Sequence, residues 1–169
     1  SGTYESACQA RDQLDVPVHV VDSRSLSMGL GWQVLAAARA REQGADVEGM
    51  IAAAEEVRDK QSVLLTVDTL EYLHRGGRIG AAAQLLGSLV QLKPILAINH
   101  ACGILEPVDK TRTRKRALAE IVDRTFKRID PHEPVHAAVL HGAAPEDARY
   151  LLDQVVERCS QVEALVSPI

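Results

Sequence analysis

The sequence predicts a mixed α/β protein with two lobes, and three observations lead to this prediction. In residues 1–77, β-rich apolar runs alternate with helical patterns, as in strands that pair in parallel through helical crossovers. From residue 93, two β-like runs are joined by a short turn around "NHACG", which is typical of an antiparallel hairpin. Hydrophobic residues make up 46% and charged residues 25% of the chain, so it should fold around an apolar core.

The first lobe is expected to contain helices and strands in alternation. Spacing and composition predict, in order, a helix at 1–14, a strand at 16–23, a helix at 30–44, a helix at 46–61 and a strand at 62–67. Gly44 is expected to follow the end of the second helix, and Asp46 to cap the third. We expect the two strands to pair in parallel, because helices separate them.

The second lobe is expected to hold a mostly antiparallel sheet packed by helices. The pattern predicts a hairpin at 93–110, a helix at 111–129, a strand at 134–142, a helix at 145–159 and a strand at 162–169. The change from parallel-type to antiparallel-type patterns places the lobe boundary, with the first lobe at 1–77 and the second at 78–169.

Composition and charge exclude several classes of function. The net charge of −4 argues against general nucleic-acid binding, which depends on neutralising phosphates. No apolar run approaches the roughly 20 residues that span a bilayer, so we expect no stable membrane insertion. The three cysteines are far apart and no C-x-x-C occurs, which favours reduced thiols in the cytoplasm over disulfides or zinc. No histidine or carboxylate spacing indicates a metal site or a catalytic residue.

The stretch "DTLEYLHRGGRIG" at 68–80 has two interpretations. In the structural one, Asp68 caps a short helix with Glu71 in a capping box, and Gly76 or Gly77 ends it in the left-handed conformation. In the functional one, the glycines let the backbone approach a ligand, and Arg78 binds a carboxylate or phosphate near the next helix start. The stretch is not a Walker A loop, because no G-K-[ST] follows.

Two hydroxyl-rich stretches allow the same pair of interpretations. Ser1 and Thr3 stand where the first helix begins, where small hydroxyls usually cap the helix but can also hold a carboxylate. The loop at 22–31, which includes Ser27, is either a serine-rich cap or a ligand-facing loop. Its G-x-G lacks the third glycine of a dinucleotide-binding fingerprint.

The segment "KTRTRKR" at 110–116 has five basic residues in seven positions. Such a segment is usually a solvated helix start, although the helix dipole disfavours cations at this end. The conflict suggests that the basic segment serves something outside the chain, and an acidic protein partner fits better than nucleic acid.

Six motifs together resemble the DegV family of bacterial fatty-acid-binding proteins: "SGTYESA", "VHVVDSRSLSMGLG", "VDTLEYLHRGGRIG", "LLGSLVQLKPIL", "GILEPVDKTRTRKRAL" and "LHGAAPEDA". They occur in family order across nearly the whole chain. The resemblance implies a two-lobed α/β protein with a fatty acid between the lobes and its tail in an apolar tunnel of the second lobe. It also implies a carrier rather than an enzyme, without a cofactor, that presents a long-chain fatty acid to a separate fatty acid kinase for acyl-phosphate formation.

The resemblance also assigns residues. It implies that Ser1 and Arg78 bind the fatty-acid carboxylate, and that Arg112 or Arg114 docks the kinase, without deciding between the two. In the same picture we expect Thr3, Ser27 and Gly77 near the head group. The tail is expected to lie against the following residues: Leu85, Leu86, Leu89 and Ile95.

Two family segments have no counterpart in this sequence. These are an N-terminal portion with a T-D-S motif and a closing I-G-x-H-x-G-P-G segment, and His141 does not match the histidine of the latter. We therefore expect a fragment that binds lipid weakly or not at all. The alternatives are a phosphoryl-transfer enzyme or phosphate-binding protein that uses the glycine-rich loops, and a regulatory interaction domain that uses the basic segment.

Overall fold

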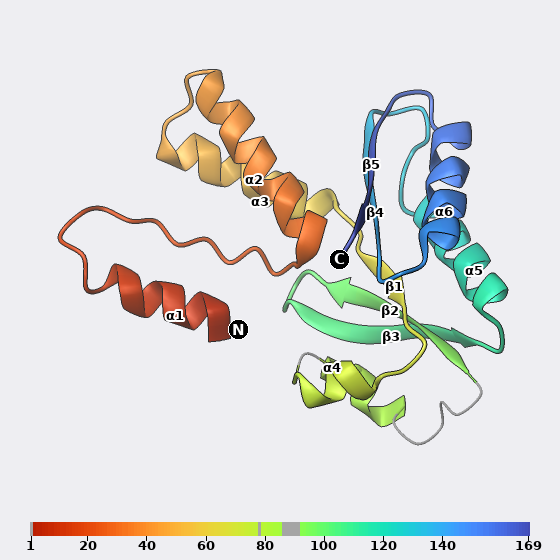
Figure 1. Cartoon of the computed structure of the whole chain (residues 1–169). Helices are drawn as coiled ribbons and strands as arrows, with labels where there is room; N and C mark the ends of the chain where they lie inside the picture. The colour runs from red at the N-terminus through yellow and green to blue at the C-terminus, as the bar shows by residue number, and fades with distance from the viewer. Residues whose placement is uncertain (1, 78, 86–91) are drawn as a thin grey trace. The chain divides into compact units, whose positions relative to one another are not determined.

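The protein is described by a computed structural model, which describes residues 2–77, 79–85 and 92–169. The chain forms two compact units, unit 1 at Ser1–Lys60 and unit 2 at Gln61–Ile169 (Figure 1). By their contacts, residues 61–77 group with unit 2, whereas the sequence places the lobe boundary after residue 77.

The described residues of unit 1 form the helices α1 (Gly2–Arg11), α2 (Ser27–Glu42) and α3 (Val47–Lys60). Helices α2 and α3 form an antiparallel pair joined by a tight turn (Figure 1). Gly44 has φ +93° just after α2, and the Asp46 carboxylate accepts a hydrogen bond of 2.9 Å from the Gly49 N–H. Both expected helix boundaries are thereby confirmed, because each depends on local chemistry alone.

The strand expected at 16–23 does not form. Residues 17–26 have no regular secondary structure, and Val16 and Val18 are 61% and 38% exposed. A strand needs a neighbour for its backbone N–H and C=O groups, and the described part of unit 1 contains no other strand. An apolar sequence alone is therefore not enough to form a strand at this position.

Unit 2 contains an antiparallel sheet of order β1-β2-β3, formed by β1 (Leu64–Thr66), β2 (Lys93–Asn99) and β3 (Ile104–Thr111). The hairpin of β2 and β3 confirms the sequence prediction. The parallel pairing expected for β1 is wrong, since β1 pairs antiparallel with β2. The hydrophobic pattern identifies β1 as a strand but indicates neither its partner strand nor the direction in which the two pair.

A second sheet of unit 2 pairs β4 (Val135–His141) and β5 (Val162–Pro168) in parallel. Helix α6 (Pro145–Arg158) connects them, and a helical crossover brings two strands into parallel alignment. The second half of the chain therefore contains the parallel pair that was expected in the first half. Helix α5 (Arg114–Phe126) packs against α6 and the three-stranded sheet.

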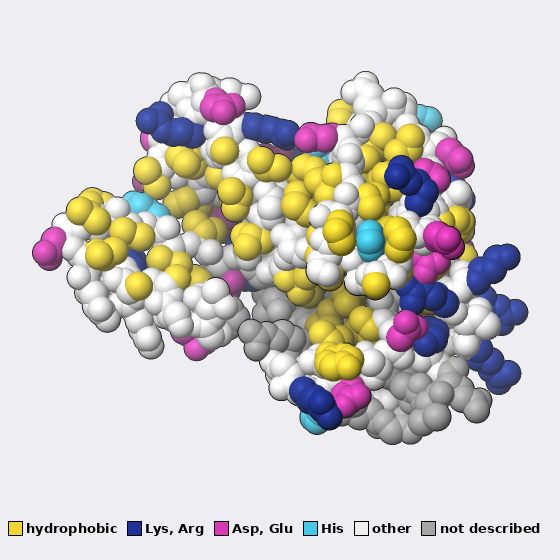
Figure 2. Space-filling view, in the orientation of Figure 1, with side chains coloured by type: hydrophobic (Ala, Val, Ile, Leu, Met, Phe, Trp, Pro, Cys, Tyr) yellow, Lys and Arg dark blue, Asp and Glu magenta, His cyan; other side chains and the backbone are white. Residues whose placement is uncertain are grey.

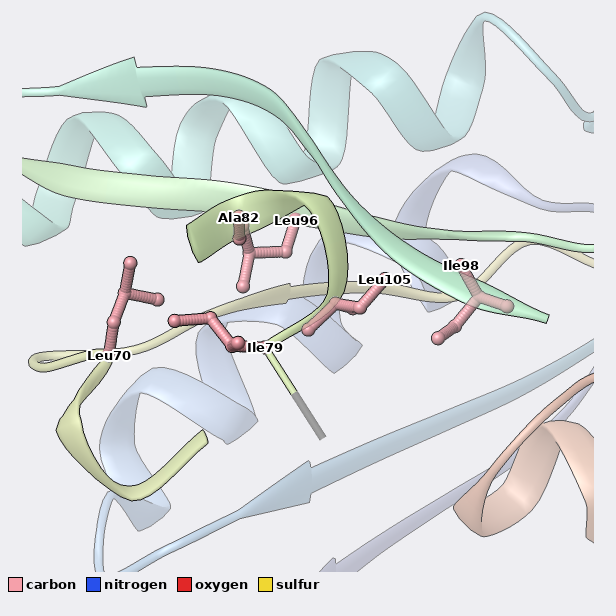
Figure 3. Packing of buried hydrophobic residues seen from close by; sticks show 6 residues of the cluster. All are labelled: Leu70, Ile79, Ala82, Leu96, Ile98 and Leu105. Carbon is pink, nitrogen blue, oxygen red and sulfur yellow. The ribbon is translucent and has the colours of Figure 1, made fainter. Parts of the chain in front are cut away.

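The three-stranded sheet of unit 2 has an apolar cluster on each face. On one face, α4 (Glu71–Arg75) and the short 3-10 helix η1 (Gly80–Leu85) bring apolar residues onto β2 and β3 (Figure 3). On the other face, Ala117 and Ile121 of α5 pack against Ile95. Adjacent residues of β2 thus point to opposite faces, with a bulge between Ile95 and Leu96.

Candidate ligand site

The stretch at 68–80 folds as a loop, the helix α4 and a left-handed end. The Gly76 N–H donates to the Tyr72 carbonyl at 3.0 Å, and the Gly77 N–H donates to the His74 carbonyl at 3.0 Å. Gly77 has φ +65°, which confirms the expected glycine stop. Arg75 is 72% exposed and forms an ion pair of 2.7 Å with Glu71, as expected for a solvent-facing side chain.

Asp68 does not cap α4, contrary to the expectation. The Thr69 hydroxyl accepts the Glu71 N–H at 3.1 Å instead. The Asp68 carboxylate forms ion pairs with Lys93 at 2.7 Å and with Arg114 at 2.9 Å. The hydrogen bond from Lys93 lowers the pKa of the Asp68 carboxyl, and the charge of Arg114 acts in the same direction. Two long-range cations therefore compete successfully with the local helix start for this carboxylate.

Gly80 begins η1 under tight packing. It has φ +52°, and a Cβ there would lie 2.5 Å from the Leu105 carbonyl oxygen. The backbone of η1 therefore rests directly against β3, which only glycine permits. Arg78, the predicted carboxylate ligand, lies outside the described residues, between this glycine and Gly77.

An apolar cluster of unit 2 lies beside this backbone. Its buried members come from the loop before α4, from residues 79–85 and from two strands (Figure 3), and they are Leu70, Ile79, Ala82, Leu96, Ile98 and Leu105. Leu85 packs against this cluster and is partly buried. We refer to these residues as the η1 cluster.

The structure separates the residues expected around the tail. Leu85 belongs to the η1 cluster, whereas Ile95 is fully buried on the other face of the sheet, against α5. Leu86 and Leu89 lie outside the described residues. Leu96 and Ile98 belong to the cluster against which Leu85 packs, but they were not predicted from the sequence. Alternation along the strand could have indicated them, because residues 96 and 98 share one face of β2 and residue 95 points to the other.

Thr3 and Ser27, which are predicted to lie near the head group, are found at the starts of helices in unit 1. Thr3 is exposed in the first turn of α1, and Ser27 is exposed as the first residue of α2 with φ +52°. Ser1 lies outside the described residues. Because Ser1, Thr3 and Ser27 belong to unit 1 and Gly77 to unit 2, their joint role stays a prediction.

The serines before α2 do not cap the helix, contrary to one interpretation of the sequence. The residue before α2 is Leu26, which makes no side-chain cap. The Ser23 hydroxyl instead accepts the Ser25 N–H at 3.3 Å, and the buried Gln33 amide donates to the Ser23 carbonyl at 3.0 Å. These bonds order the loop itself.

Unit 1 also has a pocket of about 390 Å³ that sequence analysis did not identify. It lies among α1, residues 18–24 and α3. Two of its cations are already paired, since Arg58 contacts Glu55 at 3.0 Å and Arg11 contacts Asp12 at 2.8 Å. No local motif marks this pocket, because it is lined by residues distant in sequence.

The basic segment lies at the end of β3 and the start of α5, where Lys and Arg side chains gather on the surface (Figure 2). Arg112 is exposed, whereas Arg114 is paired with Asp68 and Asp147. The two residues implied for docking thus have different surroundings.

Among the described residues, no three His, Cys, Asp or Glu side chains are grouped so that they could hold a metal ion. Within the same ranges, no helix has both the length and the apolar character needed to cross a membrane.

Known proteins resemble this chain over nearly its whole length. The family model described as "Uncharacterised protein, DegV family" matches residues 1–169. A DegV domain-containing protein of Streptomyces coelicolor is 42% identical over 158 residues, which cover 94% of this chain and 55% of that protein. Protein DegV of Bacillus subtilis is 32% identical over 165 residues, which cover 96% of this chain and 58% of that protein.

Two solved structures share the fold at similar coverage. A structure described as fatty acid binding of a DegV family protein from Thermus thermophilus has a TM-score of 0.88 and 34% identity, covering 99% of this chain and 60% of that one. The structure of DegV, a fatty acid binding protein from Bacillus subtilis, has a TM-score of 0.86 and 31% identity, again covering 99% and 60%. These matches confirm the mixed α/β class. The chain spans less than two thirds of the length of each of these relatives. It belongs to the DegV family.

Proposed function

We propose that the protein containing this chain binds a long-chain fatty acid. The observation that carries the proposal is the match to the Thermus thermophilus structure, which is described as fatty acid binding and covers 99% of this chain at 34% identity. The proposal concerns the whole protein, since the chain covers 60% of that structure.

The physical chemistry of unit 2 supports the proposal. A fatty-acid tail gains about 0.8 kcal/mol for each buried methylene group, so it needs an extended apolar surface. The η1 cluster supplies buried aliphatic side chains and almost no polar groups. We propose that the tail lies along this cluster near Leu85, Leu86 and Leu89, and that Ile95 belongs to the core behind the sheet.

A carboxylate head group needs a hydroxyl and a cation. We propose Ser1 and Arg78 for these roles, with Thr3, Ser27 and Gly77 nearby. The positive φ of Gly77 and Gly80, on either side of Arg78 in the sequence, supports this, because glycine lets a backbone approach an anion closely and the guanidinium of arginine is suited to a carboxylate.

The protein acts as a carrier in this proposal. A separate fatty acid kinase converts the presented acid to an acyl-phosphate in the cytoplasm, so the carrier needs no catalytic residue and no cofactor. The exposed Arg112 supports docking of an acidic kinase surface.

Mass spectrometry of the denatured full-length protein tests the binding proposal. The wild type should release a fatty acid in about a one-to-one ratio, and Arg78→Ala should lose most of it because the carboxylate loses its cation. Arg75→Ala is the matched control, since Arg75 is exposed and paired with Glu71. The proposal fails if the wild type carries no lipid under any growth condition. Turnover of ATP with Mg²⁺ by the protein alone would instead support a phosphoryl-transfer enzyme.

A further inference from the structure

Four charged side chains of unit 2 form one connected network. Asp68 precedes α4, Lys93 begins β2, Arg114 begins α5, and Asp147 lies in the first turn of α6. The two oxygens of Asp68 bind different cations, Lys93 at 2.7 Å and Arg114 at 2.9 Å. Arg114 also contacts the Asp147 carboxylate through its Nε. The network therefore ties together the starts of α5, α6 and β2.

The position of Arg114 explains why it needs two carboxylates. It is the first residue of α5, after Thr113, whose hydroxyl accepts the Arg116 N–H at 3.3 Å. The helix dipole disfavours a cation at this end, so an arginine here gains from nearby negative charge. Asp68 and Asp147 supply that charge, and Asp147 is itself favourably placed in the first turn of α6.

The other cations of the basic segment have different surroundings. Four of them are exposed and form no ion pair within the described part of the chain, namely Lys110, Arg112, Lys115 and Arg116. Arg114 is directed toward carboxylates of its own chain, and its side chain is 41% exposed. The segment thus contains one internally paired arginine among outward-facing cations.

We propose that Asp68 is a positioning residue for the basic segment. It binds Arg114, fixes the start of α5 against β2, and so presents Arg112 and its exposed neighbours to an acidic surface of a partner protein. In this arrangement Arg112 contacts the partner and Arg114 acts inside the chain. The inference rests on the proposed function for the identity of the partner, a fatty acid kinase, but the internal role of Asp68 does not.

The expected effects are moderate. Asp68 is 61% exposed, and ion pairs at such sites change an equilibrium by up to about fivefold. Loss of Asp68 leaves Arg114 with Asp147 as its counter-charge, so the start of α5 should loosen without unfolding of the unit.

Hydrogen exchange of the 169-residue chain tests the positioning role without any partner. Asp68→Asn should speed exchange of the α5 amides at 116–119 by up to about fivefold, and Asp68→Glu should restore most of the protection. Glu56→Gln is the matched control, because it removes another exposed ion pair, the one with Lys60 in unit 1. Unchanged exchange in Asp68→Asn would overturn the proposal.

Calorimetry of the full-length protein with a fatty acid kinase of the same organism tests the docking role. Arg112→Glu should weaken binding most, and Asp68→Asn should weaken it up to about fivefold while the bound fatty acid measured by mass spectrometry stays unchanged. Weakening by Arg114→Ala but not by Asp68→Asn would overturn the proposal, since Arg114 would then contact the partner directly. If the wild type carries fatty acid but binds no kinase, the kinase part of the proposed function fails, and hydrogen exchange alone decides the role of Asp68.

Discussion

Gly77 and Gly80 show how much one position can depend on its surroundings. Both have positive φ, +65° and +52° respectively. A Cβ at Gly77 would meet no atom within 4 Å, whereas a Cβ at Gly80 would lie 2.5 Å from the Leu105 carbonyl oxygen. The first glycine is needed only for its backbone conformation, and the second is needed also for close contact between η1 and β3.

Alanine substitutions should separate these two requirements. Gly77→Ala should lower the free energy of unfolding by about 1–2 kcal/mol, the cost of a left-handed non-glycine residue. Gly80→Ala should cost more, because it adds a clash with backbone that cannot move away cheaply. Urea denaturation of both variants measures the difference. Equal losses would show that η1 does not rest on β3 as described.

At the level of single secondary-structure elements, strand β2 separates two apolar clusters, one on each face of its sheet. Ile95 packs with Ala117 of α5, and Ile98 packs with the η1 cluster on the other face. The bulge lies between Ile95, which packs against α5, and Leu96, which packs in the η1 cluster. The two faces should therefore differ in function although both are buried.

Removal of one methylene group on each face of β2 tests, in the full-length protein, whether the two faces differ in function. Ile95→Val and Ile98→Val should each lower the free energy of unfolding by about 0.5–1.5 kcal/mol. Only Ile98→Val should shift the chain lengths of the bound fatty acids, because only Ile98 faces the proposed tail. Mass spectrometry measures the shift, and a shift in Ile95→Val alone would place the tail on the α5 side.

Across the whole molecule, the two units differ strongly in how many apolar side chains they bury. Among the described residues, Ala54 is the buried apolar side chain of unit 1, and the other buried apolar side chains belong to unit 2. Burial of apolar surface is the main source of folding free energy. Unit 1 of this chain should therefore open more readily than unit 2.

Limited trypsin digestion of the 169-residue chain measures this difference. Cleavage after Arg24, in the irregular segment of unit 1, should precede cleavage after Arg124, inside α5. Proteolysis follows the population of locally open states, and α5 is held by packing against the sheet. Mass spectrometry identifies the first fragments. Early loss of peptides from α5 would contradict the assignment of the main core to unit 2.

Interactions between residues close in sequence determined several helices, two helix boundaries and the hairpin of this protein. Helical periodicity predicted α5 and α6, Gly44 and Asp46 fixed the boundaries of α2 and α3, and the short turn predicted the hairpin of β2 and β3. These features need only neighbours within a few residues, so they can be read along the chain.

Only the tertiary structure decided which elements pair and which charges meet. The apolar run at 16–23 did not become a strand, because a strand depends on a neighbouring edge that the run itself cannot encode. Asp68 does not cap the helix that follows it but pairs with Lys93 and Arg114, which are 25 and 46 positions away in the sequence. The sequence determined the family motifs and the candidate residues, whereas the fold decided that Arg114 is paired inside the chain and that Arg112 remains exposed. The physical reason is that hydrogen-bonding edges and counter-charges are supplied by distant parts of the chain.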